Sequence, residues 1–353
     1  MIQKNIHLPI FFFAFLSLIT GIFSGWQRIG WNIDLSNVVS QHGTLMASVF
    51  FGTLLMLEKC LAMPSRYYLL IPFVNGISIL FLYFGNVHLA LSLTTLASAA
   101  MCGVAFEMKR IAKQKLYWLF IVGFFCLFAG NIFLLFTGLF QASAVLWMSF
   151  ILFIIVGERL ELTRFLAVTV AQKNLLWIAL SLVLIGVGPY HFYGNYIFGI
   201  GIICVSLWLL KFDIAFKNLK QKGQPHYSAL TIIIGYFWLI VSAFYIITAD
   251  TYNHFDYDAL LHSFFLGFAF SMIFAHVPII FPSLFKLKIK IYHPVYYVII
   301  TMMNLTVAAR IIGDQLQSDE LRKWAGLTNG LVILLFFMST IIIVFNGLRK
   351  SVN

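Results

Sequence analysis

Apolar residues run along the chain in twelve long stretches, separated by short breaks of polar residues, Gly and Pro. Each stretch has about 17 to 25 residues, the length that an α-helix needs to cross the hydrocarbon core of a bilayer. Breaks such as Gly188-Pro189 and Gly223-Gln224-Pro225 carry residues that end helices. The pattern therefore predicts spans at approximately residues 8–25, 42–62, 67–86, 88–107, 116–137, 139–157, 174–190, 194–211, 227–248, 259–283, 294–312 and 325–347.

This pattern predicts an all-α polytopic membrane protein whose twelve helices form one bundle and one domain over residues 1–353. The first span lacks a small-residue cleavage site, so we expect it to remain as a helix rather than act as a signal peptide. The composition agrees, because 61% of the residues are hydrophobic and 10% are charged. Soluble domains carry about 25% charged residues, so a soluble globular fold is excluded.

The charges predict an orientation. If the N-terminus lies in the cytoplasm, 19 of the 23 Lys and Arg residues fall on the inner side, as the positive-inside rule expects. The outer side then holds Arg28, Arg310, Arg322 and Lys323. We therefore expect both termini in the cytoplasm and the chain in the cell inner membrane. The net charge of +11 comes largely from basic loops, which we interpret as topology signals and as contacts with anionic lipid. No nucleic-acid partner is therefore expected.

The four cysteines have no metal-binding or CxxC spacing. A free Cys behaves as a small hydrophobic residue, so we expect all four to serve packing. They are Cys60, Cys102, Cys126 and Cys204.

Histidines stand out among the polar residues, because ionisable groups at membrane depth are costly and often functional. His42 begins the second span, and His262 lies about one turn into the tenth, so we expect both at similar depth near the outer face. Two neutral imidazoles can fill both axial positions of a haem iron, and bundle cores commonly hold such cofactors. The alternative for each His is a helix cap or an interfacial hydrogen bond.

Three further residues are weaker candidates. His88 begins the fourth span, as a metal ligand or as an interfacial helix-start residue. Arg310 is the outer cation set deepest in apolar sequence, and either a haem propionate or Asp314, four residues later, would balance its charge. His276 lies roughly 21 Å from His262 along a helix, so the two cannot share one iron; the alternative for it is a bond to a carbonyl freed near Pro278.

Helices 2 and 10 carry a family resemblance. Twelve spans, His42-Gly43 followed by Met46, a His early in the tenth span, and the run His276-Val277-Pro278 are similar to the catalytic subunit of haem-copper oxidases. The chain also resembles NnrS-type membrane proteins, which are haem- and copper-associated and linked to nitric oxide stress. The resemblance implies that His42 and His262 are axial ligands of a haem b, and that Arg310 contacts its propionates.

The sequence departs from the oxidases at their copper site. Residues 139–157 and 174–190 contain no His, and Phe264 stands two residues after His262, where the oxidases have a second haem ligand. These differences argue against oxygen reduction and proton pumping. The remaining copper hypothesis uses outer histidines, namely His88, His191 and His254.

Three functions follow from these observations. The first is a haem-binding protein that works with a redox partner in electron transfer, or that handles nitric oxide or another small gas. The second is a secondary transporter without a cofactor, since twelve helices are a common carrier plan; its midplane site would use Asn75, Asn131 and Asn304. The third is an assembly factor without a cofactor.

Overall fold

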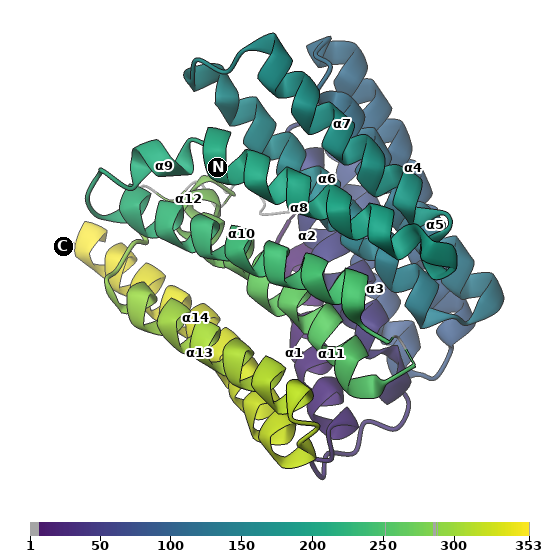
Figure 1. Cartoon of the computed structure of the whole chain (residues 1–353). Helices are drawn as coiled ribbons and strands as arrows, with labels where there is room; N and C mark the ends of the chain where they lie inside the picture. Colours follow the sequence, from purple (N-terminus) through teal and green to yellow (C-terminus); the bar gives the residue numbers. More distant parts are fainter. Residues whose placement is uncertain (1–6, 251, 285–286, 288, 353) are drawn as a thin grey trace. The chain divides into compact units, whose positions relative to one another are not determined.

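The computed structural model describes residues 7–250, 252–284, 287 and 289–352 (Figure 1). Within these ranges all regular structure is helical, and twelve helices are long and apolar enough to cross a membrane. The prediction of an all-α, twelve-span membrane protein is therefore confirmed, while the cytoplasmic placement of both termini stays a prediction. Among the predicted inner cations, Lys4, Lys286 and Lys288 lie outside the described residues.

The chain forms two compact units, residues 1–161 and 162–353. The first unit holds the first six spans, the last of which runs slightly past the boundary, and the second unit holds the other six. The expectation of a single domain stays a prediction.

The first unit is built from six spanning segments joined by short turns. Its second span is a π-helical segment that continues as an α-helix, and its third span begins with a 3-10 turn. The elements are α1 (Leu8–Arg28), η1 (Val39–Gln41), η2 (Thr44–Phe51), α2 (Gly52–Leu61), η3 (Arg66–Leu69), α3 (Leu70–Tyr83), α4 (Val87–Ala112), α5 (Tyr117–Thr137) and α6 (Phe140–Leu162).

The second unit begins after α6 and ends in a helical hairpin, in which α13 and α14 lie side by side (Figure 1). Its tenth span is again interrupted by a π-helical segment. The elements are η4 (Thr163–Phe165), α7 (Val170–Val187), η5 (Tyr190–Gly194), α8 (Asn195–Phe212), α9 (Ala215–Asn218), α10 (Gln224–Thr248), α11 (His254–His262), η6 (Ser263–Ala269), α12 (Phe270–Leu284), α13 (Val295–Gln315) and α14 (Asp319–Val352).

The tenth and the last spans begin five and six residues earlier than their hydropathy predicts. The tenth starts at His254 because the Asn253 side chain accepts a hydrogen bond from the backbone N–H of Phe255, which satisfies an otherwise free donor of the first turn. The last starts at Asp319, where Asp319 and Glu320 carry negative charge at the helix N-terminus. His262 consequently lies about two turns, rather than one, into its span.

Polar side chains compensate for irregular backbone inside the membrane-spanning helices. The Asn75 amide donates to the carbonyls of Ser48 (2.9 Å) and Val49 (3.4 Å) within the π-helical segment η2. In α12, Pro278 cannot donate to the carbonyl of Phe274, which instead accepts from the Tyr227 hydroxyl at 3.3 Å. These bonds satisfy carbonyls that lipid cannot solvate, and they fix the helices that carry the candidate histidines.

Candidate functional site

His42 lies just before η2, with its ring against α1. Its Nδ1 is 2.8 Å from the carbonyl oxygen of Gly21 and 3.4 Å from the Ser24 hydroxyl. A carbonyl only accepts, so Nδ1 carries the proton and Nε2 of the neutral ring carries the lone pair. Gly25 provides the space, because a Cβ atom there would lie 2.9 Å from Cε1 of His42. His42 is therefore held in the tautomer that can ligate a metal through Nε2.

His262 ends α11 in the second unit and has the same arrangement. Its Nδ1 is 3.0 Å from the backbone oxygen of Asp258, one turn earlier, and 3.3 Å from the Asp258 carboxylate. Both contacts are acceptors, so Nδ1 is again the donor, and Nε2 is the nitrogen that a neutral ring would offer to a metal. A backbone carbonyl or a carboxylate on Nδ1 is the usual partner of a metal-ligating His. Each candidate ligand thus lies in a position typical of a coordinating imidazole.

Two π-helical segments in the described part of the chain lie beside a His, whereas the short segment η5 is a kink whose backbone is non-helical at Phe192 and Tyr193. The segment η2 begins two residues after His42, η6 begins directly after His262, and η5 contains His191. π-Helical turns are rare and are frequent at functional sites. Sequence reasoning missed them, because a mostly apolar stretch does not distinguish α from π geometry.

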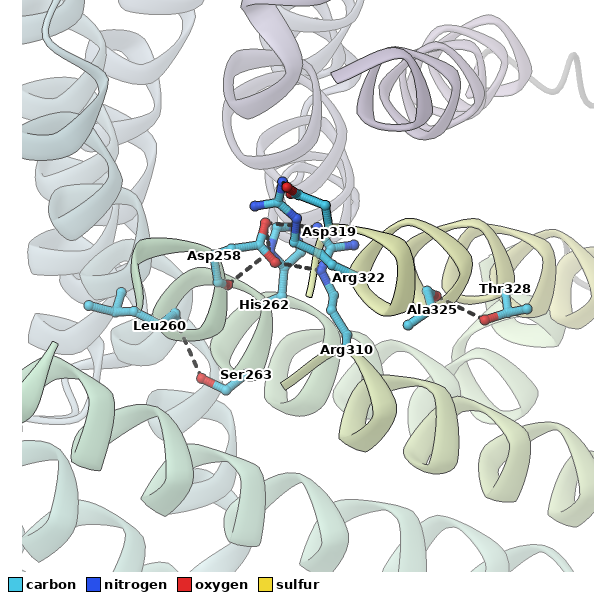
Figure 2. Close-up of polar contacts among 9 residues, drawn as sticks. All are labelled: Asp258, Leu260, His262, Ser263, Arg310, Asp319, Arg322, Ala325 and Thr328. Atoms are coloured by element: carbon cyan, nitrogen blue, oxygen red, sulfur yellow. Dashed lines mark hydrogen bonds and ion pairs between the residues drawn. The ribbon is translucent and has the colours of Figure 1, made fainter. Parts of the chain in front are cut away.

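A buried ion pair is the centre of a charged cluster beside His262 (Figure 2). Arg310 on α13 is 6% exposed, and its Nε and Nη2 lie 2.6 and 2.8 Å from the two carboxylate oxygens of Asp258. Arg310 pairs with Asp258 rather than with Asp314, and its contact to a propionate stays a prediction. Asp258 was missed in the sequence, although its position four residues before His262 places both on one helix face.

The same cluster contains a second acid and a second cation. Asp314, near the end of α13, is 1% exposed, and neither of its carboxylate oxygens has a hydrogen-bond partner among the described residues. Arg322 on α14 donates to Asp319 at 2.7 Å, and its guanidinium lies 4.7 Å from the ring of Phe255. The Nε of Arg322 is buried with no partner in the described ranges. Each arginine therefore already binds another carboxylate, and neither donates a hydrogen bond to Asp314 among the described residues.

The other histidines have simpler surroundings. His88, His191 and His254 are exposed, and no group of three or more His, Cys, Asp or Glu that could hold a metal ion occurs in the part of the chain that the structure describes. The copper hypothesis stays a prediction. His276 contacts the Met272 carbonyl at 2.6 Å through Nδ1, four residues earlier, as His262 does with Asp258.

The three asparagines of the transporter hypothesis contact neighbouring helices. Besides the bonds of Asn75 to η2, Asn131 accepts from Trp147 Nε1 at 2.9 Å and donates to the Thr94 carbonyl at 3.2 Å. Asn304 accepts from Trp238 Nε1 at 2.6 Å and donates to a carbonyl of its own helix. All three therefore make hydrogen bonds that stabilise helix packing.

At the predicted inner end of the first unit, Lys59 is buried between two glutamates. Its Nζ lies 3.1 Å from Glu58 and 2.5 Å from Glu158, and 4.7 Å from the ring centre of Phe120. Glu158, near the end of α6, therefore pairs with a buried Lys on α2.

Comparison with known proteins identifies one match. The family described as "Domain of unknown function (DUF8744)" matches residues 7–345, which include the spans of both units. No curated protein and no solved structure matches the chain. On the match over nearly its whole length, the chain belongs to the DUF8744 family.

Proposed function

We propose that this protein is a haem-binding protein of the cell inner membrane, in which His42 and His262 are the axial ligands of a haem b. The observation that carries the proposal is their shared contact: Nδ1 of each ring lies against a backbone carbonyl oxygen, which is the usual second contact of a His that ligates a metal through Nε2. Both lie beside the rare π-helical geometry. Their spans, with the sixth, are also the most buried of the twelve in the described part.

The side chains of His42 and His262 suit the iron of a haem. Neutral imidazoles are common axial ligands of haem, and the Asp258 carboxylate near Nδ1 makes His262 a more basic ligand. Arg310 is already held by Asp258, so a propionate at this cluster would compete with that pair for Arg310, whereas Arg322 offers a buried Nε donor. Bound haem would supply one-electron redox chemistry, used with a redox partner in electron transfer or in handling nitric oxide or another small gas.

The packing of the asparagines supports this proposal over a transporter. Asn131 and Asn304 each accept from a Trp indole and donate to a backbone carbonyl. Asn75 holds the carbonyls of the π-helical segment. A substrate that used these amides would have to break bonds that stabilise the helices.

The test is an absorption spectrum of the full chain, purified in detergent from haem-replete cells. The expected result is a Soret band typical of two imidazole ligands in the wild type, and its loss or marked shift in His42→Ala and in His262→Ala. The control is His276→Ala, because His276 makes the same carbonyl contact in the same span as His262 but lies too far away to share its iron.

Two results would contradict the proposal. One is wild-type protein without a Soret band after expression with excess haem. The other is a band of unchanged position and intensity in both His42→Ala and His262→Ala. Size-exclusion chromatography and the helical circular dichroism signal of each variant would show that the fold is retained.

A further inference from the structure

Asp314 is a buried acid without a compensating partner. It lies at the end of α13, is 1% exposed, and has no hydrogen bond to either carboxylate oxygen within the described residues. Burying an unpaired carboxylate is costly, and such a group becomes neutral when it can. The protonation state of Asp314 therefore decides the net charge of the cluster.

The groups around Asp314 leave its charge uncompensated. Arg310 lies one helical turn earlier but holds the carboxylate of Asp258 with two hydrogen bonds, and Arg322 holds Asp319. The titratable and charged groups that act on Asp314, or that form the cluster around it, come from α10, α11, α13 and α14. They are Tyr245, Asp256, Asp258, His262, Arg310, Asp319 and Arg322.

We infer that Asp314 is a reversible proton-binding site, and that the resting protein holds it as a neutral carboxylic acid whose O–H donates to the Asp258 carboxylate. Asp258 is the acceptor that we assign, because its carboxylate is held by Arg310, which lies one helical turn before Asp314 on α13. Asp258 itself stays ionised, because Arg310 binds both of its oxygens. The proton comes from water, and the exposed carboxylate of Asp319 (76% exposed) places this helix end within reach of solvent.

A proton fits this site better than a metal cation. Sodium and divalent cations take several oxygen ligands, whereas the described part of the chain has no group of three or more acidic, His or Cys side chains around one point. One proton removes the uncompensated charge and creates the donor that the pair of acids lacks. The site itself does not depend on haem. If the proposed function holds, however, proton binding also changes the charge beside a haem ligand, since Asp258 contacts His262.

The test is infrared spectroscopy of the full chain purified in detergent without added haem, in H₂O and in D₂O. The expected result near neutral pH is a C=O stretching band of a protonated carboxyl group that shifts in D₂O, is lost at high pH and is absent from Asp314→Asn. Asp258→Asn should shift the same band, because the acceptor changes. The matched control is Asp319→Asn, an exposed acid of the same cluster, which should leave the band unchanged.

Two spectroscopic results would overturn the inference. One is a wild-type carboxyl band that survives unchanged in Asp314→Asn, which would mean that Asp314 is ionised. The other is a band that disappears at fixed pH when sodium chloride replaces choline chloride, which would assign the site to a cation. Since these measurements need no haem, their failure is distinguishable from failure of the proposed function.

Thermal unfolding provides a second readout in case the spectra are crowded. Asn has nearly the shape of a neutral Asp, so Asp314→Asn should unfold at the same temperature as the wild type, or higher, near neutral pH. A marked loss of stability in this variant would indicate an ionised Asp314 in a structural ion pair, and would overturn the inference.

Discussion

The Asp258–Arg310 pair gives a quantitative prediction about the second unit. Replacing Arg310 with Met removes two charge-assisted hydrogen bonds of 2.6 and 2.8 Å and leaves a buried carboxylate without its counterion. Breaking a buried ion pair from one side costs about 3–5 kcal/mol. Solvent screens this pair little, because the Arg310 and Asp258 side chains are 8% and 15% exposed. We therefore expect Arg310→Met to lower the free energy of unfolding by about 3–5 kcal/mol.

The double variant separates the ion pair from loss of packing. In Arg310→Met with Asp258→Asn, no unpaired charge remains, and replacing both partners of a buried pair is often close to neutral. We expect the double variant to recover most of the stability, with a coupling energy of about 3 kcal/mol in a double-mutant cycle. The assay is reversible unfolding in mixed micelles, followed by circular dichroism.

The control pair lies in the same cluster. Arg322 and Asp319 also form a hydrogen-bonded ion pair, but Asp319 is 76% exposed, so we expect Arg322→Gln to cost no more than about 1 kcal/mol. Our reasoning would be refuted by a coupling energy for Asp258 and Arg310 below about 1 kcal/mol. It would equally be refuted by an Arg310→Met variant as stable as Arg322→Gln.

Three further predictions concern the first unit. Gly25→Ala places a Cβ atom 2.9 Å from Cε1 of His42 and displaces the ring. Since mutation of groups that orient a metal ligand typically lowers affinity by about 10-fold or more, we expect a fall of that size in haem affinity. Titration with haem would measure it, and an unchanged helical signal would show that the fold is retained. Asn75→Leu leaves carbonyls of η2 without their donor and should cost about 1–3 kcal/mol, measured by unfolding, whereas Asn75→Ser retaining full stability would contradict the role of its amide. Lys59→Met removes the counterion of Glu58 and Glu158, so the free energy of unfolding should fall by about 2 kcal/mol. A variant with the same free energy of unfolding as the wild type would show that water already compensates the charge of these acids.

The sequence by itself determined the number and approximate position of the membrane-spanning helices. Hydropathy is a property of consecutive residues, so a long apolar stretch identifies a membrane-spanning helix without knowledge of the helices that pack against it. The same reasoning selected His42, His262 and Arg310, because polar groups in apolar sequence are conspicuous. The observed boundary differs from the predicted one where a side chain such as Asn253 caps the helix and starts it before the apolar stretch begins.

The tertiary structure alone decided which polar groups meet. Asp258 and Arg310 are 52 residues apart, so no local pattern could pair them, and the nearer Asp314 looked equally suitable. The π-helical segments beside His42 and His262 also depend on packing, since their sequences are mostly apolar, like those of the α-helical spans, and a buried amide from another helix holds the carbonyls of η2. The buried, unpartnered state of Asp314 has the same origin, because burial is set by the packing of distant segments and not by neighbours in sequence.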